Sequence, residues 1–420
     1  MFENYVRTRH LAGVHSFQAE VDEQGRLVLP ADAASLYGLK PGAQVQLDQD
    51  GDGLHLRLPL THLAKVYVEP SNRCNLACRT CMRNAWHEPL GDMAWATFER
   101  LLSGLEELDT APLVFFGGLG EPLIHERILD MVSGAKALGC RVELITNATL
   151  LNESMARRLV DAGLDRLWAS LDGASPTSYA DVRLGATLPT VIANLERFSR
   201  LCNRRVELGI NFVAMRRNIA DLPRLAELAE RLGVSRLLVS NLLPHSAPMA
   251  EDVASTWAQT DPGFPGSLEV ALPRMDWNEA TGEPLYQVLR LYPATSIAGH
   301  RLDATRNRCP FVEAGATAVR WDGSVSPCLP LLHEHTYVLN RYERRSLAYS
   351  VGNLAQESLR AIWEKPDYLA LRQRLREFSF APCTACGGCY LSETNEEDCF
   401  GNLTPACGGC PWSQGVIQCP

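Results

Sequence analysis

The sequence predicts an α/β protein built on an incomplete (β/α)6 TIM-type barrel. Six short apolar runs between residues 64 and 239 alternate with helical patterns, which is typical of a parallel sheet covered by helices. Seven of the 14 cysteines lie in the last 41 residues, so a cysteine-rich extension follows the barrel. A short segment before the barrel reads as turns and strands. We therefore expect three domains, at residues 1–62, 63–300 and 301–420.

The overall composition excludes several classes of protein. The chain has 420 residues, of which 46% are hydrophobic and 21% charged, as in an ordinary soluble globular protein. No run reaches the roughly 18 apolar residues of a membrane-spanning helix, and the N-terminus does not read as a secretory signal. We therefore expect a cytoplasmic protein without membrane contact. A net charge of −9 argues against nucleic-acid binding through phosphate neutralisation.

Residues 17–60 read as short strands with tight turns and one short helix. The stretch GRLVLPADAASLYGLKPGAQVQL resembles the AbrB-like swapped-hairpin domain, whose members commonly dimerise and bind DNA. Residues 1–62 carry five basic and eight acidic side chains, which does not suit a DNA-binding face. We predict a docking or dimerisation domain.

The barrel strands are expected at the six apolar runs, and chemistry in such barrels gathers at the carboxyl ends of the strands. Helical patterns lie at 93–108, 191–202 and 221–233, and an amphipathic helix pair at 358–378. Residues 243–300 are expected to cap the barrel mouth. The six runs are Ala64–Val68, Leu113–Phe116, Val142–Ile145, Leu167–Leu171, Val206–Val213 and Leu237–Val239.

The strongest motif is RCNLACRTC, which follows the first barrel strand and contains Cys74, Cys78 and Cys81. Three thiolates can hold three irons of a [4Fe–4S] cluster and leave the fourth iron open, whereas a closed cluster needs four thiolates. Structural zinc also prefers four ligands. The motif and its position resemble the radical S-adenosylmethionine (SAM) superfamily. That superfamily commonly has an aromatic residue near adenine where this chain has Thr80.

The resemblance implies SAM contacts at the ends of the next barrel strands. The glycine-rich segment FGGLGEP would hold the methionine amine, strands three and four would contact ribose and methionine, and an arginine would pair with the carboxylate. Turn formation and strand-end capping are the alternative roles for such small polar residues. The implied contacts are Gly118, Gly120, Glu121, Thr146, Asn147, Ser170, Asp172 and Arg183.

The C-terminal cysteines resemble the SPASM extension of radical SAM enzymes, which carries auxiliary [4Fe–4S] clusters. CTACGGC begins like a ferredoxin run, and Gly323 precedes a cysteine by the spacing G-x4-C. Nine cysteines are candidate ligands, and two closed clusters would need only eight. A zinc-ribbon spacing through residues 383, 386, 407 and 410 is the alternative. The nine are Cys309, Cys328, Cys383, Cys386, Cys389, Cys399, Cys407, Cys410 and Cys419.

The remaining cysteines and several histidines receive no role. Cys140 and Cys202 are expected to pack as small apolar side chains. A lone histidine is more often packed or hydrogen-bonded than catalytic, so no function is assigned to His125, His245, His333 or His335.

The whole chain resembles the SPASM-containing maturases associated with tungsten cofactor oxidoreductases. This implies reductive cleavage of SAM to a 5′-deoxyadenosyl radical, one or two auxiliary clusters, and a low-potential donor such as ferredoxin or flavodoxin. The implied partner is a tungsten-containing aldehyde ferredoxin oxidoreductase-type enzyme or its tungstopterin cofactor. Two alternatives remain open: a radical SAM peptide maturase, and an iron–sulfur redox-sensing DNA-binding regulator.

Overall fold

The computed structural model divides the chain into two compact units, residues 1–62 and 63–420. It describes residues 18–36, 39, 45–50, 53–57, 59–86, 88–254, 271–272, 278, 280–291, 296–297, 300–301, 307–339, 342–381, 383 and 389–420.

The described residues of the first unit form two antiparallel strand pairs and one short helix. β1 (Glu20–Val21) pairs with β2 (Leu27–Val28), and β3 (Gln46–Asp50) pairs with β4 (Gly53–Arg57). Between the pairs lies α1 (Ala31–Leu36). The carboxylate of Asp22 accepts hydrogen bonds from the backbone of the β1–β2 turn, in which Gly25 adopts a left-handed φ of 76°. The resemblance of this unit to an AbrB-like domain remains a prediction, and part of the matching stretch lies outside the described residues.

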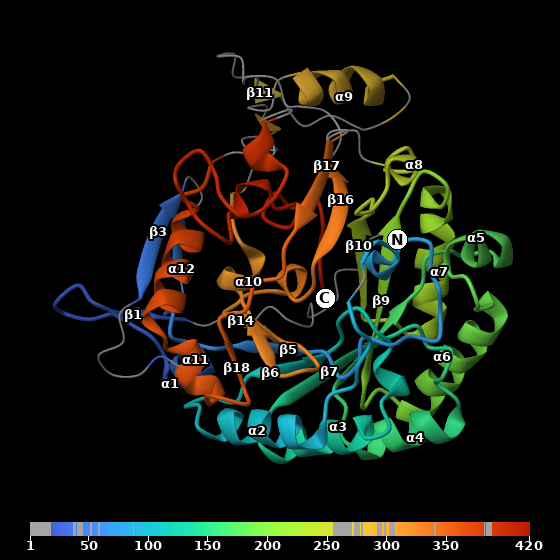
Figure 1. Ribbon diagram of the computed structural model, residues 1–420, viewed down its shortest axis with the longest axis horizontal. Coiled ribbons are helices and arrows are strands. Elements are labelled where there is room, and N and C mark those ends of the chain that lie inside the picture. The colour runs from blue at the N-terminus through green and yellow to red at the C-terminus, as the bar shows by residue number, and fades with distance from the viewer. Residues whose placement is uncertain are drawn as a thin grey trace, which may run out of the picture. The chain divides into compact units, whose positions relative to one another are not determined.

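All six predicted barrel strands form one parallel sheet in the order β10-β9-β8-β7-β6-β5. The α/β partial-barrel prediction is therefore confirmed (Figure 1). Because the strands run parallel, their carboxyl ends meet at one edge of the sheet. The bounds are β5 (Lys65–Val68), β6 (Leu113–Phe116), β7 (Arg141–Thr146), β8 (Arg166–Ser170), β9 (Glu207–Ala214) and β10 (Arg236–Asn241).

Helices on the outer face of the sheet connect these strands (Figure 1). Their starts follow local chemistry: the side chain of Asn152 caps one helix, and Ser175 forms a capping box. Gly233, with a φ of 70°, ends another. The helices are α2 (Trp95–Glu106), α3 (Ile128–Ala137), α4 (Glu153–Asp161), α5 (Pro176–Val182), α6 (Leu188–Cys202) and α7 (Leu222–Leu232).

The C-terminal extension continues the barrel sheet. β14 (Ala316–Val319) pairs in parallel with β5, and β15 (Ser324–Ser326) and β18 (Gly352–Asn353) follow antiparallel, giving nine strands. The extension also contains the hairpin β16 (His335–Leu339) and β17 (Tyr342–Ser346). Its helices are α10 (Pro310–Glu313), α11 (Leu359–Trp363) and α12 (Pro366–Glu377). The last two form the predicted helix pair.

The connection between barrel and extension is described only in pieces. These are α8 (Ala247–Ala250), α9 (Gly282–Leu291) and a small sheet of β11 (Ala271–Leu272), β12 (Ser296–Ile297) and β13 (His300–Arg301). Much of the predicted cap over 243–300 lies outside the described residues. In the part of the chain that the structure describes, no helix has the length and apolarity needed to cross a bilayer.

Candidate functional site

The three clustered cysteines lie on the loop between β5 and a short 3-10 helix, η1 (Met82–Ala85). Cys78 is buried, and Cys74 and Cys81 are half-buried. Two side chains from the barrel rim direct N–H groups at the sulfurs: Asn147 Nδ2 lies 3.8 Å from Cys74 Sγ, and Arg183 Nη1 lies 3.8 Å from Cys78 Sγ. Such hydrogen bonds suit thiolates that bind a cluster, because they tune the reduction potential of the cluster.

The triplet fits a cluster better than a single ion. Among the described residues, no three Cys, His, Asp or Glu side chains converge to hold one metal ion. A [4Fe–4S] cluster instead takes one thiolate per iron, so its ligands are spread out. Burial raises the pKa of the Cys78 and Cys81 thiols. The free thiols are therefore neutral at pH 7, and metal binding would displace their protons.

The glycine segment after β6 packs directly against the backbone of the cysteine loop. The Glu121 N–H donates to the Arg73 carbonyl at 2.8 Å. A Cβ at Gly120 would lie 2.0 Å from the Ser71 carbonyl oxygen, so only glycine fits there. Gly118 has a φ of 120°, and a Cβ on it would lie 2.8 Å from the Glu69 carboxylate. The structure thus brings the two strongest motifs together at one edge of the sheet.

Glu121 joins the ends of β6 and β7. Its carboxylate is buried and accepts from the Thr146 hydroxyl and the Asn147 N–H, both at 2.7 Å, and from the Leu123 N–H at 3.1 Å. Burial raises the pKa of Glu121, and these hydrogen bonds oppose the shift. The carboxylate therefore braces two strand ends. Its predicted contact with an ammonium group remains a prediction.

Asp172 and Arg183 form a buried ion pair at the end of β8, with Nε and Oδ2 2.7 Å apart. Asp172 also accepts from the Val213 N–H at 2.9 Å, which fixes the carboxylate. Burial alone would lower the pKa of Arg183, but Asp172 beside it raises that pKa overall. Asp172 thus orients Arg183 towards the cysteine loop. Ser170, at the end of β8 and two residues before Asp172, is also buried.

A cavity at the barrel mouth is lined by both motifs. Thr80 and Met82 from the cysteine loop, Gly118 from the glycine segment and Asn211 from β9 face it. Sequence reasoning missed Asn211, whose Oδ1 is buried and has no hydrogen-bond partner among the described residues. A polar residue in the middle of an apolar strand was the available signal. The cavity combines apolar walls with few polar groups, as small-molecule sites do.

The last residues of the chain line the same cavity. Asn241 Nδ2 donates to the Val416 carbonyl at 2.9 Å, the Gln418 N–H donates to Ser240 Oγ at 3.0 Å, and Lys65 Nζ donates to the Pro420 carbonyl at 2.7 Å. Cys419 therefore lies in the barrel, where its sulfur accepts from Trp412 Nε1 at 3.2 Å.

A second cavity, within the extension, collects five of the cysteines that the structure describes. Burial raises the pKa of Cys328 and Cys407 well above the ordinary thiol value, and neighbouring thiols add to the shift. Cys309 and Cys410 are among those neighbours. The five that line the cavity are Cys309, Cys328, Cys383, Cys407 and Cys410. A zinc ribbon would use only three of these together with Cys386.

Two further cysteines of the extension, Cys399 and Cys389, lie on segments that the structure describes. The buried carboxylate of Asp398 accepts from the Ala381 N–H at 2.9 Å, so the turn carrying Cys399 is held beside the segment that leads to Cys383. Cys389 is half-buried at the start of the 3-10 helix η6 (Tyr390–Ser392). Cys386 lies outside the described residues.

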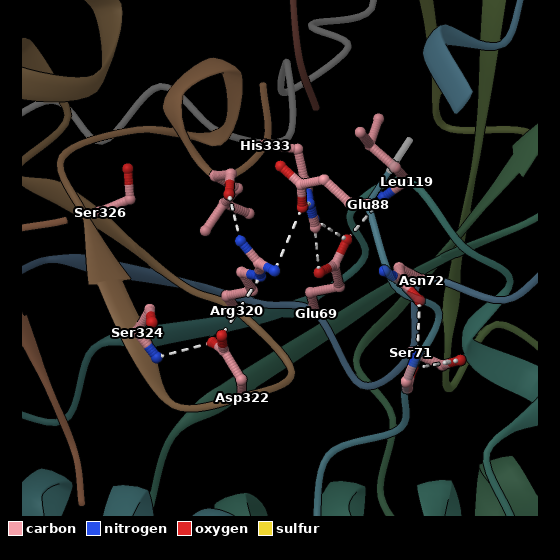
Figure 2. Close-up of polar contacts among 12 residues, drawn as sticks. Glu69, Ser71, Asn72, Glu88, Leu119, Arg320, Asp322, Ser324, Ser326 and His333 are labelled. Atoms are coloured by element: carbon pink, nitrogen blue, oxygen red, sulfur yellow. Dashed lines mark hydrogen bonds and ion pairs between the residues drawn. The ribbon is translucent and has the colours of Figure 1, made fainter. Parts of the chain in front are cut away.

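Sequence reasoning also missed a buried group of charges between the barrel and the extension. His333 is 1% exposed and contacts Glu69 and Glu88, and Arg320 contacts Glu88 in turn (Figure 2). Its members lie far apart in the sequence, so no local pattern reveals it.

Two family models match the chain: the radical SAM superfamily over residues 68–229 and the SPASM iron–sulfur cluster-binding domain over residues 309–390. A tungsten-containing aldehyde ferredoxin oxidoreductase cofactor-modifying protein from Pyrococcus furiosus is 31% identical, covering 84% of this chain and 96% of its own length. A pre-heme d1 synthase from Dinoroseobacter shibae is 26% identical, covering 82% of this chain and 83% of its own length.

A solved structure of SuiB from Streptococcus suis, bound to its precursor peptide SuiA, has the same fold. It is 15% identical with a TM-score of 0.51, covering 79% of this chain and 72% of that one. The chain therefore belongs to the radical SAM superfamily, in the SPASM-containing family that includes the tungsten-containing aldehyde ferredoxin oxidoreductase cofactor-modifying protein.

Proposed function

We propose that this enzyme matures a tungsten-dependent oxidoreductase by modifying its tungstopterin cofactor or the protein that holds it. The observation that carries the proposal is the relative from Pyrococcus furiosus, which is named for modifying the cofactor of a tungsten-containing aldehyde ferredoxin oxidoreductase and matches over 96% of its length. The partner would be an oxidoreductase of that kind, and ferredoxin or flavodoxin would supply the electron.

The barrel would perform the SAM-dependent step. Bound together, a [4Fe–4S] cluster and SAM would supply a one-electron reductive cleavage of the sulfonium, which gives methionine and a hydrogen-abstracting 5′-deoxyadenosyl radical. Cys74, Cys78 and Cys81 would hold the cluster, and Asn147 and Arg183 would donate to their sulfurs. The remaining predicted contacts would orient SAM at the barrel mouth: Gly118, Gly120, Glu121, Thr146, Ser170 and Asp172. Side chains around the cavity would exclude water from the radical.

The extension would hold two auxiliary clusters. Cys309, Cys328, Cys407 and Cys410 share one cavity and are the ligands proposed for one cluster. Four other cysteines would hold the second: Cys383, Cys386, Cys389 and Cys399. This division uses eight of the nine candidates and leaves Cys419, which lines the barrel cavity instead.

The test is to express a tungsten oxidoreductase anaerobically with and without this protein and to compare the mass of the extracted pterin. We expect a mass difference that disappears in the Cys74→Ala variant, because that variant lacks a ligand of the first cluster. Identical pterins and identical oxidoreductase activity would contradict the proposal.

A peptide substrate is the second candidate. A PqqA peptide cyclase from Granulibacter bethesdensis is 26% identical, but over only 42% of this chain. The match is confined to less than half of the molecule, so it supports the shared chemistry more than a shared substrate. Formation of 5′-deoxyadenosine with an unchanged pterin would favour this candidate.

A further inference from the structure

A buried histidine joins the two ends of the cysteine loop to the extension. His333 Nε2 lies 2.8 Å from Glu69 Oε2, and its Nδ1 lies 2.5 Å from Glu88 Oε2. Glu69 follows β5 and precedes the cysteine loop, whereas Glu88 follows η1 at the exit of the loop. The ring of Trp86, also at the exit, packs edge-on against the imidazole, with centroids 4.3 Å apart. One side chain from the extension therefore contacts both flanks of the loop (Figure 2).

The hydrogen bonds of His333 restrict where the protons of this group can lie. A neutral imidazole has one N–H donor, and only an imidazolium donates from both ring nitrogens. Both nitrogens of His333 contact carboxylates, so the geometry requires the protonated form or a protonated carboxyl. Glu88 forms an ion pair with a second cation besides His333, because Arg320 Nη2 lies 3.2 Å from its Oε2. In the described part of the chain, the ion-pair partner of Glu69 is His333.

Glu69 contacts the glycine segment as well as His333. Its carboxylate is fully buried, and its Oε1 accepts from the Leu119 N–H at 3.1 Å. The same carboxylate lies against Gly118, which has a φ of 120°. A buried ionised carboxylate is tolerated only when it is paired. Loss of the imidazolium would therefore force Glu69 to take up a proton or move, and either change disturbs the Gly118–Leu119 turn.

We propose that His333 is a positioning residue for SAM: it supplies from the extension the positive charge that holds Glu69, and through Glu69 it fixes the Gly118–Leu119 turn. The inference rests on the proposed SAM contact of that glycine segment and not on the tungsten substrate. It follows that the barrel does not complete its SAM site alone. The extension contributes the missing counter-charge through His333, which lies five residues after Cys328.

The test compares SAM binding in full-length, cluster-reconstituted wild-type protein and the His333→Gln, Glu69→Gln and double variants. SAM is titrated against the electron paramagnetic resonance signal of the reduced first cluster, and 5′-deoxyadenosine formation gives KM and kcat. We expect His333→Gln to raise the Kd and KM for SAM at least tenfold and to change kcat less. The double variant should bind SAM no more weakly than His333→Gln, because a Gln–Gln pair needs no counter-charge.

The control is Asp322→Asn, at the outer end of the same group. Asp322 lies 3.5 Å from Arg320 and contacts neither Glu69 nor the glycine segment in the described structure, so the Kd for SAM should stay within twofold of wild type.

A His333→Gln protein with wild-type SAM affinity would overturn the positioning role. Loss of first-cluster iron in proportion to lost SAM binding would overturn it too, because the defect would then be structural. If His333→Gln does not fold, the double variant, which removes the unpaired charge, is measured instead: restored folding and SAM binding would support the role of the counter-charge, and a double variant that does not fold either would overturn it. Since SAM is the only ligand used, the result is independent of the pterin comparison.

Discussion

At the scale of single residues, the site depends on three buried carboxylates that accept hydrogen bonds. Glu121, Asp172 and Glu69 are each nearly inaccessible, and each accepts backbone N–H groups from a neighbouring segment. Such carboxylates act as fixed braces, because leaving a buried donor or acceptor unpaired costs about 1–3 kcal/mol.

Removing the Thr146 hydroxyl should destabilise the barrel mouth. Thr146→Val keeps the shape of the side chain but takes one donor from Glu121, so we expect about 1–3 kcal/mol less stability. Thermal unfolding of the anaerobic protein measures the loss, and Thr146→Ser, which keeps the hydroxyl, is the control. Equal thermal unfolding midpoints for the Thr146→Val and Thr146→Ser variants would contradict the proposed role of this hydrogen bond.

The charge on His333 should make stability depend on pH. Burial alone would lower the pKa of His333, but its hydrogen bonds to Glu69 and Glu88 outweigh burial and raise the pKa. Its stabilising contribution is therefore complete below the unfolded pKa of about 6.5 and is lost as the pH rises through the higher folded pKa. Arg320 faces the same group, and His335 Nδ1 donates to the His333 carbonyl at 3.0 Å.

The measurement is the thermal midpoint against pH for wild type and His333→Gln. The midpoint difference between them should shrink as the pH rises above neutrality. A difference that does not vary between pH 6 and 9 would show that His333 does not change its charge over that range.

At the scale of elements, the site is made where strand ends and loops pack backbone to backbone. The glycine segment after β6 lies on the loop after β5, and the contact leaves no room for a side chain at Gly120. The cysteine loop is thereby held in part by a neighbouring strand end.

Gly120→Ala should displace the cysteine loop. The added Cβ would meet a backbone oxygen at 2.0 Å, and backbone cannot move aside as a side-chain end can. We expect loss of iron from the first cluster and loss of 5′-deoxyadenosine formation. The control is Gly134→Ala in α3, where the new Cβ would meet the end of the Leu102 side chain at 3.1 Å. Full iron content in Gly120→Ala would contradict the packing argument.

At the scale of the whole molecule, barrel and extension share one sheet. β14 pairs with β5 over Lys65–Val68, and the end of the chain lies in the barrel cavity. Aromatic side chains from both parts form one buried cluster, including Tyr67, Phe115, Phe311 and Trp412. We therefore expect the barrel and the extension to depend on each other for folding.

A chain that ends at residue 300 should not give a stable barrel. It would expose the β5 edge, which β14 covers in the full protein, and exposed edges promote aggregation. It would also lack His333, leaving Glu69 without its ion-pair partner. We expect aggregated material in size-exclusion chromatography, with the full-length protein as the control. A monodisperse truncated barrel that binds SAM would contradict both the shared-sheet argument and the role of His333.

The sequence by itself determined the features that short-range patterns encode. Apolar periodicity located all six strands, and the spacing of Cys74, Cys78 and Cys81 indicated the cluster loop, because both depend on residues close together in the chain. Only the tertiary structure grouped five described cysteines of the extension in one cavity and put Cys419 in another. It also brought His333 to Glu69, 264 positions away. These contacts depend on how β14 adds to the barrel, and that pairing joins segments about 250 residues apart, beyond the reach of any local pattern.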